Sequence, residues 1–187
     1  MGFLGRVDPT ARHGRTQAGR RDFDRKNRSL SLVFVGILAE HKGVHTAIEA
    51  LDRLSAEERQ HVRLTILGTG HRQYEERLHN LVIQLQLSDY ISFQAPILRS
   101  ALPDFLGKFD VLLLPSIWSE PLARIMQEGL ASGMVVVGSA NGGTAETISH
   151  GENGLLFAPG DAVRRQRPTS SRAASRRSRS LGSPSSP

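Results

Sequence analysis

The sequence predicts a single α/β domain with a mostly parallel sheet, helices on both faces and a ligand crevice at the carboxyl ends of the strands. Short aliphatic runs alternate with stretches of helical periodicity through the middle of the chain. These runs are too short for helices and too uniformly apolar for strands with one wet face, which is typical of buried parallel strands. The 187 residues suffice for one sizeable core, and no apolar run approaches the roughly 20 residues of a membrane span.

The predicted elements follow one another with short connections. Each long helix carries apolar residues at the spacing of one face, and Gly133 is expected to cap the last of them. The expected strands are 32–36, 62–67, 91–93, 111–114 and 135–137, and the expected helices are 44–54, 71–87, 102–109 and 122–132.

Glycine-rich turns punctuate this pattern. Between 68 and 70, Gly-Thr-Gly is a tight strand-to-helix turn that lacks the remaining residues of a dinucleotide fingerprint or a P-loop, so it carries little functional weight. The turn at 141–146 is expected to place Thr144 as a helix N-cap. Residues 151–159 predict a hairpin-like turn and a last strand.

The charge divides the chain into three parts. Residues 1–31 hold eight Lys/Arg against three Asp/Glu, and residues 162–187 hold seven Arg and no acid. Both ends lack apolar periodicity, so they are expected to be disordered basic tails. The segment 32–161 holds nine basic against fifteen acidic residues, and this acidic balance argues against a nucleic-acid-binding surface on the folded part.

The sequence contains no cysteine, which excludes disulfides, thiol chemistry and cysteine-ligated zinc and suits a cytoplasmic protein. The histidines between 41 and 150 are scattered without metal-ligand spacing. We therefore expect no bound metal.

Two glutamates, Glu120 and Glu128, mark the stretch around which the chain is organised. They are separated by seven residues in P-S-I-W-S-E-P-L-A-R-I-M-Q-E-G-L-A-S-G, residues 115–133, which predicts a loop followed by a helix. The amino end of such a helix is a prepared anion site. A carboxylate on either side could hold the hydroxyls that flank the anion, as in a nucleotide sugar. The alternative is that both glutamates are solvated charges near a helix end.

Together with the Pro-Ser before it and the Ser-Gly-x-Val-Val-Val after it, this pattern resembles the donor-site motif of retaining glycosyltransferases of family 4, which have the GT-B fold. Residues 32–161 resemble the C-terminal, nucleotide-sugar-binding domain of that family. The resemblance implies a single Rossmann-like domain, the donor half of a hexosyltransferase, with a nucleotide-diphosphate sugar as donor and no metal or other cofactor.

The resemblance also implies roles for individual residues. Glu128 would bind the ribose hydroxyls, Glu120 the transferred sugar, and Ile97 would lie beside the base in a cleft that includes Gly36. The groups expected to hold the diphosphate are Lys42 and the backbone amides of Leu122, Ala123 and Arg124. Glu120 and Lys42 would be the catalytic residues.

The sequence departs from the family in two places. In the segment 36–43, Lys42 and Gly43 match the family's Gly-Arg-Leu-x-x-x-Lys-Gly, but Ile37 stands at the arginine position. Arg124 could replace part of that lost charge. The acceptor-binding domain has no counterpart, so we expect a fragment of a truncated or frame-shifted gene that lacks this domain or relies on a partner chain and is inactive alone.

Two other interpretations stay open at this point. The chain could be a non-catalytic nucleotide-binding remnant. It could also bind nucleic acid through its arginine-rich tails, which predicts a steep salt dependence, although no aromatic platform supports that function.

Overall fold

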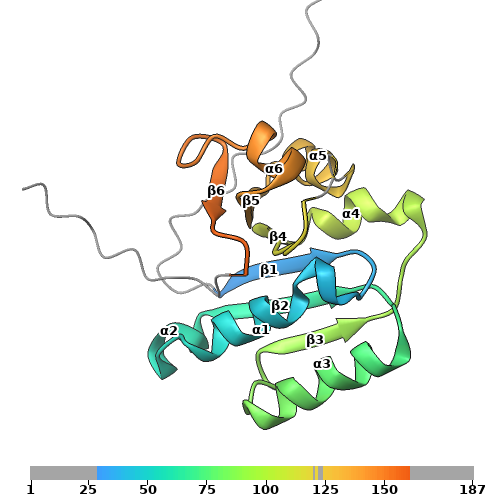
Figure 1. The fold of residues 1–187 in the computed structure, drawn as a ribbon, viewed down its shortest axis with the longest axis vertical. Coiled ribbons are helices and arrows are strands. Elements are labelled where there is room, and N and C mark those ends of the chain that lie inside the picture. The colour runs from blue at the N-terminus through green and yellow to red at the C-terminus, as the bar shows by residue number, and fades with distance from the viewer. Residues whose placement is uncertain (1–28, 120, 122–123, 161–187) are drawn as a thin grey trace, which may run out of the picture.

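The computed structural model describes residues 29–119, 121 and 124–160, and they form one α/β domain around a six-stranded parallel sheet (Figure 1). The strand order is β3-β2-β1-β4-β5-β6, and every neighbouring pair is parallel. The described part of the chain starts with β1 in the middle of the sheet, winds to the β3 edge and then returns to β4 beside β1. This order places a topological switch point between β1 and β4, where open α/β sheets bind ligands. The strands are β1 (Leu30–Val35), β2 (Val62–Leu67), β3 (Ile91–Gln94), β4 (Val111–Leu114), β5 (Val135–Ser139) and β6 (Gly154–Phe157).

Helices lie on both faces of the sheet, as predicted (Figure 1). Alternate residues of β1 point to opposite faces, so Phe34 joins the core cluster under α1 and α3, whereas Val33 joins the cluster under α4 and α5. Both side chains are buried, because a parallel sheet with helices on its two faces has no wet face at its centre. The helices are α1 (Val44–Asp52), α2 (Ala56–Gln60), α3 (Arg72–Gln84), α4 (Leu102–Leu106), α5 (Arg124–Ala131) and α6 (Gly142–Thr147), with 3-10 turns at Glu40–Lys42 and Arg99–Ala101.

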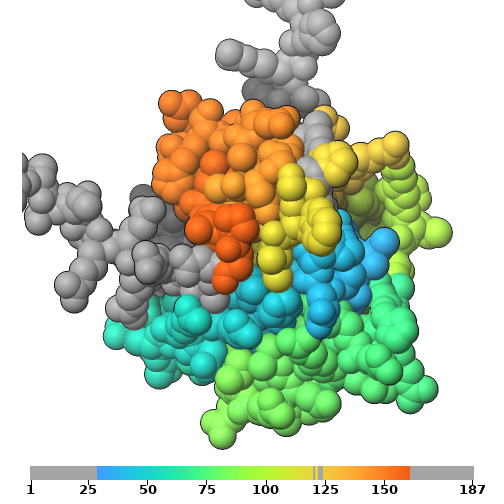
Figure 2. All heavy atoms as spheres, in the orientation of Figure 1, coloured from blue at the N-terminus to red at the C-terminus, as the bar shows by residue number. Residues whose placement is uncertain are grey.

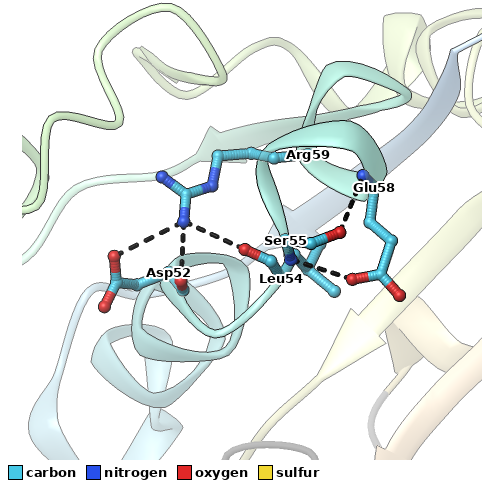
Figure 3. Close-up of polar contacts among 5 residues, drawn as sticks. All are labelled: Asp52, Leu54, Ser55, Glu58 and Arg59. Atoms are coloured by element: carbon cyan, nitrogen blue, oxygen red, sulfur yellow. Dashed lines mark hydrogen bonds and ion pairs between the residues drawn. The ribbon is translucent and has the colours of Figure 1, made fainter.

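Helix α2 is an element that the sequence analysis did not predict (Figure 3). Its amino end is a capping box, in which the Ser55 hydroxyl accepts from the Glu58 amide at 3.2 Å and the Glu58 carboxylate accepts from the Ser55 amide at 2.8 Å. The Arg59 guanidinium then donates to the carbonyls of Asp52 at 2.6 Å and Leu54 at 3.1 Å. Helix α2 therefore folds back to satisfy carbonyl groups at the carboxyl end of α1.

The structure corrects two expectations at the end of the domain. Strand β6 is parallel to β5, with Val137 opposite Leu155, so residues 151–159 do not form a hairpin with the preceding strand. A parallel pair needs a crossover, and α6 supplies it. Helix α6 begins at Gly142 with Asn141 at the N-cap, so Thr144 lies inside the helix and is not its cap.

Other boundaries differ by a few residues. Strand β1 begins at Leu30, and α4 ends at Leu106 instead of extending to 109. The predicted disordered tails, apart from residues 29–31, lie outside the described residues.

Candidate functional site

The crevice at the carboxyl ends of the central strands contains two adjoining hollows that share Val35 and Gly36. The larger, about 260 Å³, is mostly apolar and is formed by the segments that follow β1, β2 and β3. The smaller, about 40 Å³, lies between the ends of β1 and β4 at the switch point. The larger hollow is lined by Val35, Gly36, Ile37, Leu67, Gly68, Thr69, Pro96, Ile97 and Leu102. The smaller is lined by Phe34, Val35, Gly36, Lys42, Leu114, Ser116, Pro121, Ile125, Asn141 and Thr144.

Lys42 is brought to the smaller hollow by two loops that dock backbone to backbone. Gly43 has a φ of +67°, and a Cβ atom there would lie 1.9 Å from the carbonyl oxygen of Pro115. The Ile117 amide also donates to the His41 carbonyl at 2.8 Å. Only glycine permits this approach, so the β1–α1 and β4–α5 loops form one unit, and they meet in the space-filling view (Figure 2).

The Gly-Thr-Gly turn after β2 supports the same β1–α1 loop from the other side. A Cβ atom at Gly70 would lie 1.8 Å from the Leu38 carbonyl oxygen, and the Leu38 amide donates to the Thr69 carbonyl at 3.0 Å. Hydrogen bonds from the Thr69 hydroxyl and the Gly70 amide hold the pKa of the Glu75 carboxyl below its ordinary value. The turn therefore fixes the loop that carries Gly36 and Ile37.

The β5–α6 loop closes the smaller hollow opposite Lys42. The Asn141 side-chain amide donates to the Ser116 carbonyl at 3.1 Å, which ties this loop to the β4–α5 loop. Asn141 and Thr144 both line the hollow with Lys42. From the sequence, Thr144 was expected only as a helix N-cap and Asn141 was given no role, so the place of both polar side chains in this hollow is a finding of the structure.

Glu128 lies on α5 and forms an ion pair with a residue that the sequence analysis did not single out. The Arg99 guanidinium is 3.5 Å from Glu128 Oε1, and 72% of the Arg99 side chain is exposed against 33% for Glu128. Arg99 opens the 3-10 turn after Ile97 and Leu98. The sequence marks Arg99 only by its position, as a basic residue two residues after Ile97 in the predicted base-binding loop.

Comparison with known proteins identifies the family. The sequence profile described as Glycosyl transferases group 1 matches residues 16–166. The chain belongs to this family. The prediction of a glycosyltransferase C-terminal domain with an α/β, Rossmann-like fold is therefore confirmed at the level of group 1 glycosyltransferases and the GT-B architecture.

Individual relatives agree with this assignment. The putative colanic acid biosynthesis glycosyltransferase WcaL of Salmonella typhimurium is 35% identical over 138 residues, which are 71% of this chain and 33% of WcaL. Spore coat protein SA of Bacillus subtilis is 31% identical over 132 residues, 67% of this chain and 34% of that protein. The crystal structure of Anabaena HepE in complex with UDP-glucose superposes with a TM-score of 0.66 at 26% identity and covers 72% of this chain and 36% of HepE. The chain thus spans about a third of the length of the curated relatives it matches.

The residues expected to form the donor site of this group 1 glycosyltransferase domain fall into three sets. Gly36, Lys42 and Ile97 line the hollows, and Gly36 belongs to both. Glu128 lies beside Arg99 and lines neither hollow, and Arg124 is exposed at the first described residue of α5. Glu120, Leu122 and Ala123 lie outside the described residues.

A histidine–tyrosine pair lies behind the β1–α1 loop. His45 Nδ1 and the Tyr74 hydroxyl are 2.8 Å apart, and the two rings meet edge to face. Burial lowers the pKa of His45 and raises the pKa of Tyr74, so both side chains are held in their neutral forms. This neutral pair joins α1 to α3 beneath the loop.

Two further site types are absent from the described part of the chain. Within it, no group of three or more His, Asp or Glu side chains is placed to hold a metal ion. None of its helices is long and apolar enough to cross a membrane.

Proposed function

We propose that this chain is the nucleotide-sugar-binding half of a retaining glycosyltransferase of family 4, which transfers a hexosyl group from a nucleotide-diphosphate donor. The observation that carries this proposal is the pair of adjoining hollows at the carboxyl ends of the central strands, one mostly apolar and one containing Lys42. Anabaena HepE, which has the same fold at 26% identity, was crystallised with UDP-glucose.

Each hollow would bind a different part of such a donor. The larger hollow offers Ile37, Pro96 and Ile97 to the apolar faces of a base. Lys42 in the smaller hollow neutralises the diphosphate. Glu128 accepts hydrogen bonds from the ribose hydroxyls, and Glu120 accepts them from the transferred sugar.

The catalytic groups are those that meet the leaving diphosphate, since negative charge builds there in the transition state. At the diphosphate these groups are Lys42 and the amides of Leu122, Ala123 and Arg124, and Glu120, which holds the transferred sugar, is the second catalytic residue. Because a lysine and a helix amino end already supply positive charge, the proposed reaction requires no metal ion.

The acceptor is held by a region or a partner outside these residues. Transfer needs the acceptor about 3–3.5 Å from the sugar carbon with water excluded. No group assigned to an acceptor is among the residues that line the two described hollows. The chain alone is therefore expected to bind its donor weakly and to show no turnover. In nucleotide binding it would then behave like the non-catalytic remnant of the alternative interpretation.

Titration calorimetry at low salt with UDP, GDP and ADP tests the binding step. At least one nucleotide should bind, and Glu128→Ala should weaken that binding by about 1–3 kcal/mol because a pair of ribose hydroxyls loses its acceptor. Glu57→Ala, an exposed charge on α2, is the matched control and should bind as the wild type does. Failure of all three nucleotides to bind at millimolar concentration would refute the proposal.

A further inference from the structure

We infer that Arg99 is a positioning residue that holds the Glu128 carboxylate, and that this pair gives the site its selectivity for a ribose over a 2′-deoxyribose. The inference rests on the proposed function. It starts from the 3.5 Å contact between the Arg99 guanidinium and Glu128 Oε1, which joins two segments 29 residues apart.

The position of Arg99 in the sequence connects this contact with the larger hollow, which is proposed to bind the base. Arg99 follows the loop that contains Pro96 and Ile97, and it precedes α4, whose first residue is Leu102. Pro96, Ile97 and Leu102 all line the larger hollow. Arg99 therefore lies between lining residues of that hollow in the sequence, and its guanidinium reaches Glu128 on α5.

The Arg99–Glu128 pair is better placed to orient the Glu128 carboxylate than to stabilise the fold. Both partners are partly or largely exposed, and ion pairs of that kind add little to the stability of a protein. A glutamate side chain on its own samples several rotamers. The described contact engages Oε1, so it restricts the carboxylate and still presents Oε2 as an acceptor.

A carboxylate fixed in this way discriminates between sugars by its hydrogen-bonding requirement. A ribose offers two neighbouring hydroxyl donors, whereas a 2′-deoxyribose offers one. Sites built to hydrogen-bond a substrate hydroxyl reject the analogue that lacks it, because a desolvated acceptor is then left without a donor. Losing Arg99 should therefore reduce affinity mainly for the ribonucleotide.

The test compares one nucleotide with its 2′-deoxy analogue. The nucleoside diphosphate that binds most tightly among UDP, GDP and ADP is titrated beside its 2′-deoxy form into the wild type, Arg99→Ala, Arg99→Lys and Glu128→Ala. We expect Arg99→Ala to weaken the ribonucleotide roughly fivefold to tenfold and the deoxynucleotide less than about twofold, a coupling in the usual range for contacting residues. Arg99→Lys keeps the charge and should retain part of the selectivity.

Two controls separate orientation from general charge or folding effects. Arg72→Ala removes an arginine from another exposed ion pair, with Glu76 on α3, and should change neither affinity. The double variant Arg99→Ala/Glu128→Ala should bind no more weakly than Glu128→Ala, since Arg99 acts through Glu128.

The outcomes distinguish the inference from the function on which it rests. If the wild type binds none of the three nucleotides, the proposed function fails and the inference fails with it. If the wild type binds but Arg99→Ala weakens both sugars equally, or neither, the proposed function stands and the role of Arg99 is wrong. Equal losses would mean that Arg99 contacts the base or the phosphates directly.

Discussion

Ile37 occupies the position at which the resemblance to family 4 calls for an arginine, and the residue is 66% exposed at the larger hollow. Its neighbour Gly36 lines both hollows, and Lys42 lines the smaller one. We predict that Ile37→Arg tightens nucleoside diphosphate binding by on the order of 1.5–3 kcal/mol, more than it tightens a monophosphate. Calorimetry at two salt concentrations measures this, and the gain should shrink as salt rises.

The matched control for that prediction is Ile83→Arg, since Ile83 is 65% exposed on α3, away from both hollows. It adds the same charge without placing it at the crevice. Equal gains in both variants would mean that net charge alone attracts the nucleotide. No gain at position 37 would mean that this residue does not face the phosphates.

At the residue scale, the sequence could locate groups that belong to a local motif and could not locate those defined by a distant contact. Lys42 was singled out by the resemblance to the family's Lys-Gly motif, and in the structure it lines the smaller hollow beside a glycine that the loop geometry requires. Arg99 and Asn141 were missed because their partners, Glu128 and the Ser116 carbonyl, are 29 and 25 residues away. Nothing in the local pattern around either residue records such a contact.

At the scale of elements, local signals set the strands well and the connections less well. Aliphatic runs bounded by glycine or proline placed β2 and β4 at their observed bounds. Helix α2 has only five residues, too few for a periodic signal, although its Ser55-x-x-Glu58 capping box was visible in the sequence. The direction of β6 could not be found from its own residues, because apolar alternation is the same for parallel and antiparallel strands; the crossover through α6 decides it.

The docking of the β1–α1 loop on the β4–α5 loop gives a prediction at the same scale. In Gly43→Ala, the new Cβ would overlap the Pro115 carbonyl oxygen, 1.9 Å away, and the residue would keep an unfavourable φ of +67°. We expect a loss of about 2–4 kcal/mol in the free energy of unfolding and weaker nucleotide binding, since Lys42 moves with the loop. Urea denaturation measures the first effect and calorimetry the second.

Gly151→Ala provides the control for Gly43→Ala. Gly151 has a φ of +84°, and nothing lies within 4 Å of a Cβ atom built there. It therefore carries the backbone strain without the collision and should cost only about 1 kcal/mol. If the two substitutions cost the same, the two loops are not held together in solution as they are in this structure.

At the scale of the whole molecule, the two faces of the sheet differ in polarity where the described helices do not cover them. On the face that α4 and α5 cover, the β2–β3 half carries polar side chains, and the Thr65 and Ser92 hydroxyls bond across it at 3.2 Å. On the opposite face, strands β4 to β6 present apolar side chains beside α1. These residues border a hollow of about 330 Å³ whose lining includes Leu113, Val135, Val137, Leu155 and Phe157. The polar β2–β3 half-face is suited to contact with water, whereas the apolar β4–β6 half-face is not.

Because the β4–β6 half-face is apolar and exposed, we predict that the protein self-associates through it and that one added charge on this half-face reduces the association. Leu155 is 44% exposed on the apolar half-face, whereas Leu156, one residue along β6, packs against the core cluster of the opposite face. Leu155→Lys should therefore raise the concentration at which the protein scatters light and leave its melting temperature nearly unchanged, because a lysine on an exposed strand opposes edge-to-edge association. Leu156→Lys, which adds the same charge to the same strand, should cost about 2–4 kcal/mol by placing an ammonium group in the core. Static light scattering and thermal unfolding of both variants measure the two effects. A destabilisation by Leu155→Lys as large as that by Leu156→Lys would show that the half-face is covered in solution.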